Sequence, residues 1–495
     1  MSKLIIQNGN MCELDLPLKF AQKLYNEFAI RHPNAFYLRT RQRGMQNWDG
    51  KIHYITKTGQ FKIGLLPKVY DMCIEMGIKP KVVDMRQPLP KVSKVVTNIG
   101  KYKLRPEQEK AVKAVINNKI GNTPFHIGVL DYTVNAGKTL IMSSLYLSYK
   151  KQLKTLLITN DSDWLNQARE EFKQYLPGED ITFVQGKVLN WSNFTIGMVQ
   201  SISRNMRFYQ KELSQIDMVL VDEADQGGSK QYQNVITRLF NTRIRIGLSG
   251  TIYMSKLAKD KVKNMNLECF FGKVIAEFKL KDSIKKGYST KTVVKMVPGK
   301  PWYGNWESDC ISYKEIYDDS ITNCYTAWLM AYNRLLWNLN QGRYPALVVC
   351  KHIAHCENLY KFFKKKLGDA YNIAYVHVNT PSKLRQQIMK DFREGKIDIL
   401  VSTTIIARGK NFPKLKYLLN TASMDSQEKS IQFLGRLVRT DESKNKVYLD
   451  DLHYPGNYLD RHGKHRKQYY QRQELKVILL DKLWKKHPNH SLIKS

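Results

Sequence analysis

The stretch Asp131-Tyr-Thr-Val-Asn-Ala-Gly-Lys-Thr139 lies between an apolar run, residues 125–130, and residues 140–147, which have the pattern of a helix. A loop of small residues between a strand and a helix suits a bound phosphate, because N–H groups at a helix N-terminus point towards the anion. The stretch therefore predicts a phosphate-binding loop at the end of a buried strand.

Within this loop, the lysine would reach the outer phosphates and the threonine hydroxyl would ligate Mg²⁺. The full pattern has a glycine five residues before Gly137, where this chain has Tyr132. The residues expected to hold the nucleotide here are Asn135, Ala136, Gly137, Lys138 and Thr139.

A second apolar run, residues 218–221, ends in Asp222-Glu-Ala-Asp225. Buried strands of a parallel sheet read as continuous Val, Leu and Ile, and their carboxyl ends are where such folds place ligands. Asp222 would hold the Mg²⁺ shared with a nucleotide, and Glu223 would orient or deprotonate the attacking water. A solvated acidic turn is the alternative, and the phosphate loop upstream favours catalysis.

The composition favours a polyanionic partner. The chain has 495 residues, with 80 Lys and Arg against 44 Asp and Glu, a formal net charge of +36. A chain of this length predicts several domains. The surplus of positive charge favours a nucleic-acid partner, because each phosphate that a lysine or arginine neutralises releases counterions. Seven scattered cysteines indicate a reducing compartment, and no apolar run approaches the length of a membrane span, so we expect no membrane partner.

Residues 1–97 carry none of the phosphate-site features, so we expect a separate accessory domain that binds nucleic acid. Its residues 36–51 combine arginines with aromatic neighbours, which suits phosphate contacts and base stacking. A charged strand face with a tryptophan anchor beside an Asp-Gly turn is the alternative. The nucleic-acid-binding residues expected here are Arg39, Arg41, Arg43, Trp48 and Lys51.

Residues 98–297 alternate strands with helices, which predicts right-handed crossovers and a parallel sheet. Apolar runs at residues 155–159, 194–199 and 244–248 each end in a polar loop, and these loops should open on the edge of the phosphate site. Upstream, Gln108 lies on an amphipathic helix. Its amide could read an adenine edge as donor and acceptor, although a lone glutamine on a helix is usually just solvated.

After a Tyr- and Trp-rich helical connector, residues 298–341, the alternation resumes in a second domain, residues 342–452. Two arginines, Arg436 and Arg439, are spaced to share one helix face, and fixed guanidiniums can stabilise charge on a γ-phosphate. The tail, residues 453–495, is basic and should pack on the second domain, with residues 475–484 as an amphipathic helix.

The order of these motifs resembles that of the superfamily 2 helicases. They follow the family order across about residues 100–450: Gln108, residues 137–139, 222–225, 249–251, 404–409 and 432–439. The Asn-Trp-Asp-Gly core of residues 41–51 and the Tyr-rich basic tail are similar to the UvsW-type DNA helicases of tailed phages. The resemblance implies an α/β fold of two RecA-like parallel-sheet domains in tandem, preceded by a small α+β N-terminal accessory domain.

The resemblance also implies further roles. ATP would be the nucleotide, with Mg²⁺ as its ion, and the two arginines would reach it from the second domain. Thr404 stands where many relatives have an acidic residue. By resemblance Arg105 and Gln432 lie at the nucleotide, Asp225, Ser249 and Thr251 couple hydrolysis to motion, and Gln200, Thr404 and Arg408 contact nucleic acid.

We therefore expect an ATP-dependent DNA helicase or translocase that unwinds or remodels branched DNA in replication, recombination or repair. It would be a monomer acting on single-stranded or branched DNA in the cytoplasm, or in the host-cell cytoplasm if the chain is phage-encoded. Two alternatives stay open: an RNA helicase, and a nucleic-acid-binding protein that no longer hydrolyses ATP. The presence of Lys138, Glu223, Arg436 and Arg439 argues against the second.

Overall fold

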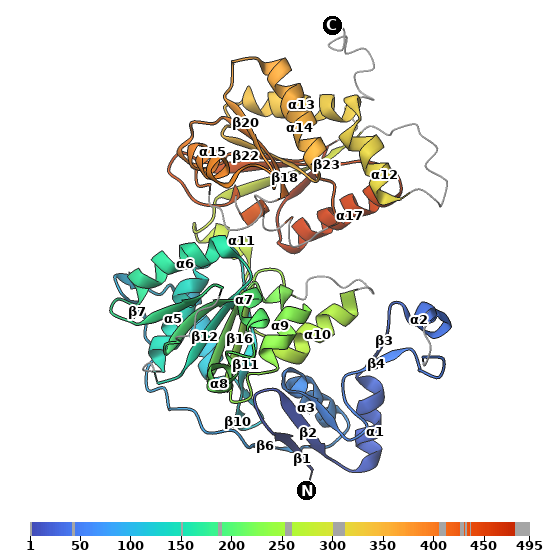
Figure 1. Cartoon of the computed structure of the whole chain (residues 1–495), viewed down its shortest axis with the longest axis vertical. Helices are drawn as coiled ribbons and strands as arrows, with labels where there is room; N and C mark the ends of the chain where they lie inside the picture. Colours follow the sequence, from blue (N-terminus) through green and yellow to red (C-terminus); the bar gives the residue numbers. More distant parts are fainter. Residues whose placement is uncertain are drawn as a thin grey trace. The chain divides into compact units, whose positions relative to one another are not determined.

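The structure, a computed structural model, describes residues 2–41, 45–149, 152–186, 191–252, 260–299, 312–404, 412–425, 430, 433–435 and 437–480. The chain divides into two compact units, Met1–Phe278 and Lys279–Ser495 (Figure 1). The sequence predicts this boundary after residue 297. The division falls earlier because strand β18 (Lys291–Pro298) pairs with strand β23 (Lys446–His453) of the second unit.

The N-terminal part of the first unit is a small α+β subdomain around a four-stranded sheet in the order β5-β2-β1-β6. Strand β2 runs antiparallel to β1, whereas β6 joins β1 in parallel. A ribbon of β3 and β4, with helix α2 between them, carries the arginine-rich segment. The bounds are β1 Lys3–Ile6, β2 Met11–Asp15, α1 Leu18–Glu27, β3 Ala29–Arg31, α2 Ala35–Arg41, β4 Lys51–His53, β5 Gln60–Lys62, η1 Ile63–Leu65, α3 Leu66–Glu75 and β6 Lys81–Asp84.

Seven strands form the large sheet of the first unit, in the order β13-β14-β12-β15-β16-β11-β17, and all their pairings are parallel. The apolar runs of the sequence are its central strands, and every residue of β11, β12, β15 and β16 is buried. Continuous burial is what helices on both faces of a parallel sheet require. The strands are β11 His126–Tyr132, β12 Thr155–Thr159, β13 Ile181–Val184, β14 Phe194–Met198, β15 Met218–Asp222, β16 Ile244–Ser249 and β17 Val274–Phe278.

The helices around this sheet follow the expected alternation. They are α4 Pro106–Ile116, α5 Lys138–Ser148, α6 Ser162–Tyr175, α7 Val199–Arg204, α8 Gln210–Ser214, η2 Ala224–Gln226, α9 Lys230–Ile236 and α10 Lys261–Phe271. Two short ribbons precede β11, formed by β7 Asn98–Ile99 with β8 Tyr102–Lys103 and by β9 Lys119–Ile120 with β10 Thr123–Pro124.

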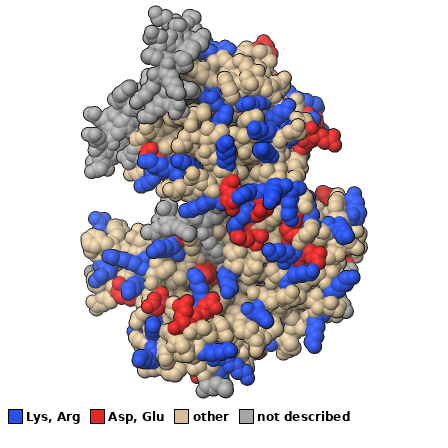
Figure 2. All heavy atoms as spheres, turned by 180° about the vertical axis from the view of Figure 1, so that it is seen from behind, with Lys and Arg blue, Asp and Glu red and all other residues tan. Residues whose placement is uncertain are grey.

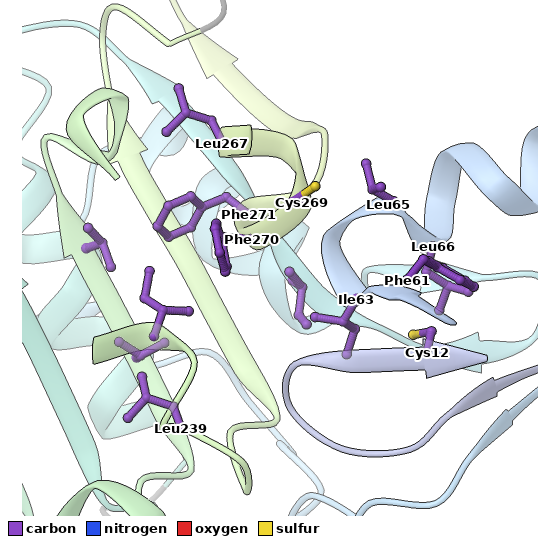
Figure 3. Packing of buried hydrophobic residues seen from close by; sticks show 14 of the residues in the cluster. Cys12, Phe61, Ile63, Leu65, Leu66, Leu239, Leu267, Cys269, Phe270 and Phe271 are labelled. Carbon is purple, nitrogen blue, oxygen red and sulfur yellow. The ribbon is translucent and has the colours of Figure 1, made fainter. Parts of the chain in front are cut away.

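The N-terminal subdomain and the large sheet share one hydrophobic core. Figure 3 shows Ile63 and Leu65 of the subdomain near Cys269 and Phe270 of α10. The backbones also approach closely, because a Cβ on Gly64 would lie 2.1 Å from the carbonyl oxygen of Glu268. The expected separate domain of residues 1–97 is therefore packed into the first unit.

A buried arginine of the large sheet forms hydrogen bonds with the N-terminal subdomain. Arg245, on β16, is 0% exposed and donates hydrogen bonds to the Gly9 carbonyl (2.6 Å), to Oδ1 of Asn10 (2.8 Å) and to the Phe270 carbonyl (3.3 Å). A buried cation is tolerated only with such acceptors. These hydrogen bonds make the position of the β1–β2 turn dependent on the large sheet.

The second unit contains another parallel sheet of seven strands, in the order β20-β21-β19-β22-β23-β18-β24. Its strands, besides β18 and β23, are β19 Ala346–Cys350, β20 Ile373–Val376, β21 Ile399–Thr403, β22 Tyr417–Asn420 and β24 Val477–Leu479. The helices are α11 Leu280–Lys285, α12 Tyr313–Tyr317, the π-helix η4 Asp318–Thr322, α13 Tyr325–Leu339, α14 Ile353–Leu367, α15 Ser382–Glu394 and α17 Asn457–Arg472.

Two expectations about this unit are corrected. The connector expected at residues 298–341 is part of the unit, because α12, η4 and α13 bury apolar side chains in its core. The helix expected at residues 475–484 is instead β24 over its first part, which pairs with β18. Before it, α17 is held by Arg466, which is 0% exposed and donates to both oxygens of Asp451 at 2.8–3.0 Å. In the described ranges, no helix combines the length and the apolar character needed to cross a membrane.

Candidate active site

The loop between β11 and α5 has the geometry that its glycine requires. Gly137 has φ 72°, in the left-handed region, and a Cβ there would lie 2.3 Å from Nε2 of Gln108. Asn135 also has a positive φ, 65°. The positive φ angles of Asn135 and Gly137 turn the chain sharply before Lys138, the first residue of α5.

Gln108 supports this loop. Its side chain is 1% exposed; Oε1 accepts a hydrogen bond from the Arg105 amide at 2.8 Å, and Nε2 donates to the Ala136 carbonyl at 2.8 Å. The amide thus joins the start of α4 to the phosphate loop. A contact of Gln108 or Arg105 with a base stays a prediction.

Tyr132 stands where the full loop pattern has glycine. In this chain that position belongs to the sheet and not to the loop. It ends β11, its ring is 0% exposed, and its hydroxyl donates to the Glu107 carbonyl at 2.8 Å. Its centroid lies 6.0 Å from that of Phe278. The departure from the pattern is accommodated by core packing and leaves the turn at Gly137 in place.

Lys138 and Asp222 face each other across adjacent elements. Nζ of Lys138 lies 3.8 Å from Oδ1 of Asp222, which ends β15. Burial raises the pKa of the Asp222 carboxyl, and the charge of Lys138 opposes this shift. Oδ1 is buried without a hydrogen-bond partner. A buried carboxylate oxygen that has a lysine at 3.8 Å but accepts no hydrogen bond is a suitable ligand for a hard cation, so the site fits Mg²⁺.

Glu223 follows in a strained conformation, with φ 51°. Burial, with the charges of Asp222 and Asp225 beside it, raises the pKa of Glu223 to about 8. The Gln226 amide donates to its Oε2 at 3.4 Å. A carboxyl with a pKa near the working pH is suited to accept a proton from water.

The three residues expected to couple hydrolysis to motion form one network. The hydroxyl of Ser249, at the end of β16, donates to Oδ1 of Asp225 at 2.7 Å and lies 3.1 Å from the Thr251 hydroxyl. The Thr251 amide donates to the Ser249 oxygen at 3.1 Å. The acidic motif and the loop after β16 are therefore connected directly.

The same sheet edge holds Gln200, which was expected to contact nucleic acid, and two polar residues that the sequence did not single out, Asn160 and Gln226. Nε2 of Gln200 donates to the Asn160 carbonyl at 3.3 Å, and the Asn160 side chain bonds that of Gln226. Asn160 follows β12, so the rule that carboxyl ends of parallel strands share one edge was the signal that could have identified it. Among the described residues, no three His, Cys, Asp or Glu side chains are grouped to hold a metal by themselves.

Two of the residues expected to bind nucleic acid in the N-terminal subdomain, Arg39 and Lys51, line a pocket of about 520 Å³, whereas Arg41 and Trp48 are not part of its lining. Its basic lining comes from α2 and from the strands before and after it: Arg39 on α2, Arg31 on β3 and Lys51 on β4. Trp48 closes the turn beside it, donating from its indole to the Lys51 carbonyl at 2.9 Å, while Arg41 stacks on Tyr37 with 5.2 Å to the ring centroid. Trp48 is thus a turn anchor next to a basic surface.

In the second unit, Thr404 follows β21 directly. The carbonyl of Arg439 accepts a hydrogen bond from the Thr290 hydroxyl at 3.0 Å, and the turn before it is held by Lys444, whose buried Nζ donates to the Leu437 carbonyl at 3.0 Å. The expected sites at Arg43, Arg408, Gln432 and Arg436 lie outside the described residues.

Two family models match the chain, one in each unit. The description "Type III restriction enzyme, res subunit" covers residues 101–254, and "Helicase conserved C-terminal domain" covers residues 329–441. Similar curated proteins include a candidate helicase of the Sulfolobus islandicus filamentous virus, 22% identical over 71% of this chain and 64% of the relative. Another is the candidate ATP-dependent helicase IRC3 of Saccharomyces cerevisiae, 23% identical over 70% of this chain and 51% of the relative. The chain thus spans between half and two thirds of the length of these relatives.

Solved structures with a similar arrangement have low sequence identity. The DNA-bound Type ISP restriction-modification enzyme LlaBIII has a TM-score of 0.57 at 15% identity, covering 81% of this chain and 33% of that one. Saccharomyces cerevisiae Dbp5 bound to RNA and ADP BeF3 has a TM-score of 0.51 at 14%, covering 78% and 92%. T4 UvsW has a TM-score of 0.45 at 19% identity, covering 97% and 98%. At such identities the likeness concerns the fold.

Proposed function

We propose that this chain, which belongs to superfamily 2 of the helicases and contains two RecA-like parallel-sheet domains in tandem, hydrolyses ATP to move along and remodel DNA. The observation that supports this most strongly is the pairing of Lys138 with Asp222 at 3.8 Å, with Glu223 next in the chain. A phosphate-binding cation, a cation ligand and a proton acceptor then meet at the carboxyl edge of one sheet.

In this proposal the loop before α5 binds the triphosphate through its backbone N–H groups, and Lys138 contacts the outer phosphates. Thr139 and Asp222 would hold Mg²⁺, which supplies charge neutralisation on the phosphates. Glu223 orients the attacking water and, once ionised, accepts its proton, and its raised pKa makes the carboxylate a stronger base.

The network of Asp225, Ser249 and Thr251 would transmit a change at the acidic motif to the loop after β16. Its hydroxyl bonds run from the residue beside the proton acceptor to a different strand. A shift of the acidic motif during hydrolysis would break or remake the bond at 2.7 Å, so this network is a candidate two-state element.

We propose DNA, single-stranded or branched, as the substrate, with roles in replication, recombination or repair, and a monomer as the active form. The net charge of +36 and the basic pocket beside α2 support a polyanionic partner. RNA is the alternative, since the similar structures include both a DNA-bound and an RNA-bound protein. The roles of Arg408, Gln432, Arg436 and Arg439 belong to the same proposal.

One comparison of ATPase rates tests the proposal. The full chain is assayed without nucleic acid and with single-stranded DNA, forked DNA, four-way DNA or RNA. Strong stimulation by DNA is expected. Greater stimulation by forked or four-way DNA than by single-stranded DNA would indicate a remodelling enzyme, and equal stimulation would indicate a simple translocase. Stimulation by RNA alone would replace the substrate, and an absence of hydrolysis under every condition would favour a binding protein.

A further inference from the structure

The second unit has a cluster of cations and aromatic rings that the proposed ATP chemistry does not use. We call it the Trp337 cluster: Lys295, Arg334, Trp337, Arg343, Lys446 and Tyr448. Trp337, on α13, is 41% exposed, and three cations surround its ring, with Lys295, Arg343 and Arg334 at 4.7, 4.8 and 5.0 Å from the centroid. Cation–π contacts of this kind place positive charge against an accessible ring.

A second ring extends the cluster. The Arg343 guanidinium lies 3.6 Å from the Tyr448 centroid, so it stacks between Tyr448 and Trp337. Lys446 and Lys295 lie 5.8 and 6.0 Å from the same Tyr448 centroid. The result is a continuous run of alternating rings and cations.

Of the four cations in the cluster, one has a carboxylate partner within ion-pair distance in the described part of the chain. Arg334 pairs with the buried Asp450, donating from Nη2 at 2.6 Å and from Nε at 2.9 Å. In the part of the chain that the structure describes, Lys295, Arg343 and Lys446 have no carboxylate within ion-pair distance. Burial lowers the pKa of Lys295, the charge of Asp450 opposes this shift, and the neighbouring guanidiniums and Lys446 add to it.

The cluster is distinct from the nucleic-acid residues expected in this unit. Lys446 begins β23, Tyr448 is its third residue, and Arg343 comes just before β19. Thr404, in contrast, follows the carboxyl end of β21. Because the strands are parallel, all their first residues lie at one end of the sheet and all their last residues lie at the other end.

We propose that the Trp337 cluster is a second nucleic-acid-binding surface, which takes a single-stranded segment with phosphates on Lys295, Arg343 and Lys446 and a base against Trp337. Rings and guanidiniums side by side are the combination that binds single strands without sequence preference. An acidic protein segment would use the charges but has no need of the exposed indole. Figure 2 shows Lys and Arg side chains spread over the visible face of both units. The proposal depends on nucleic acid being the partner, as argued above.

Binding of a fluorescent single-stranded DNA oligonucleotide to the full chain, over a series of salt concentrations, tests this surface. Lys446→Glu changes an exposed residue and should weaken binding and reduce the salt slope by about 0.7 for each phosphate that is no longer neutralised. Trp337→Ala should weaken binding about fivefold or more, and Trp337→Phe should restore most of it because a ring remains. The ATPase rate without DNA should stay at the wild-type value in all three variants.

The matched control is Lys365→Glu, the same charge change at an exposed residue of α14, a helix that packs on β19, β20, β21 and α13 and carries no residue of the Trp337 cluster. Equal decreases in affinity for Lys446→Glu and Lys365→Glu would overturn the proposal, since they would reflect net charge alone. Wild-type affinity and salt slope in Lys446→Glu and Trp337→Ala would also overturn it. Binding of a polyglutamate peptide that Lys446→Glu abolishes, with DNA binding unchanged, would assign the cluster to an acidic protein instead. No binding of DNA or RNA by the wild type would refute the proposed substrate itself.

Discussion

Replacing Glu223 by Gln should slow hydrolysis strongly and stabilise the protein at the same time. The side chain is buried beside Asp222 and Asp225, and its pKa is raised from 4.5 to about 8. The unfolded chain releases this proton near pH 4.5 and the folded chain near pH 8. The free energy of unfolding therefore falls as pH rises between these values and changes little above them.

The structure sets the size of both effects. One pKa unit corresponds to about 1.4 kcal/mol, so the shift corresponds to at most about 5 kcal/mol of stability that Glu223→Gln recovers at pH 8 but not at pH 4.5. Loss of a proton acceptor should lower kcat by about 10² to 10⁴. In the wild type, kcat/KM should rise about tenfold from pH 7 to pH 9 as the free enzyme's carboxyl ionises.

The assay combines ATPase rates at pH 7, 8 and 9 with denaturant unfolding at pH 5 and pH 8. Glu75→Gln, at an exposed carboxylate on α3, is the control and should change neither. Hydrolysis by Glu223→Gln at the wild-type rate would refute the catalytic role. A stability difference from wild type that is the same at pH 5 and pH 8 would refute the account based on burial.

Four further outcomes are expected. Lys138→Ala should abolish ATPase activity while DNA affinity, measured by fluorescence anisotropy, stays near wild type; parallel loss of both would contradict its assignment to the phosphates. Ser249→Ala removes the bond to Asp225 and should uncouple unwinding from hydrolysis, so preserved unwinding per ATP would count against the network. Arg439→Ala should lower kcat by about 10³ with a much smaller change in ATP affinity, and an unchanged kcat would exclude an arginine-finger role. Arg245→Met leaves three buried acceptors without their donor and should destabilise the first unit by about 3 kcal/mol in denaturant melts, whereas no change would show that these hydrogen bonds are dispensable.

The sequence predicted the loop before α5 and the acidic end of β15 at the positions where the structure has them. Phosphate loops and acidic strand ends are contiguous in the chain, so their backbone geometry follows from a few adjacent residues such as Gly137 and Lys138. Gln108 is a residue whose contact could not be predicted from adjacent residues. Its distance of about thirty residues from the loop gave no indication that its amide would be used to hold the Ala136 carbonyl.

The structure groups the chain into units differently from the domains that the sequence predicts. Residues 1–97 were expected to form a separate domain because they lack the phosphate-site motifs. The absence of motifs does not indicate which surface a segment packs against. Only the structure shows Gly64 against the α10 backbone and Arg245 bonded to the Gly9 carbonyl. The supposed connector likewise became part of a core, since α13 buries its apolar face on the second sheet.

By itself the sequence determined the parallel α/β architecture, the family and the position of the loop between β11 and α5, because strand periodicity and short motifs are local properties of the chain. Tertiary structure alone decided the raised pKa of Glu223, the bond between Ser249 and Asp225, and the assembly of Lys295, Trp337 and Arg343 on one surface. These features depend on burial and on distances between segments far apart in sequence, which only the folded chain brings together.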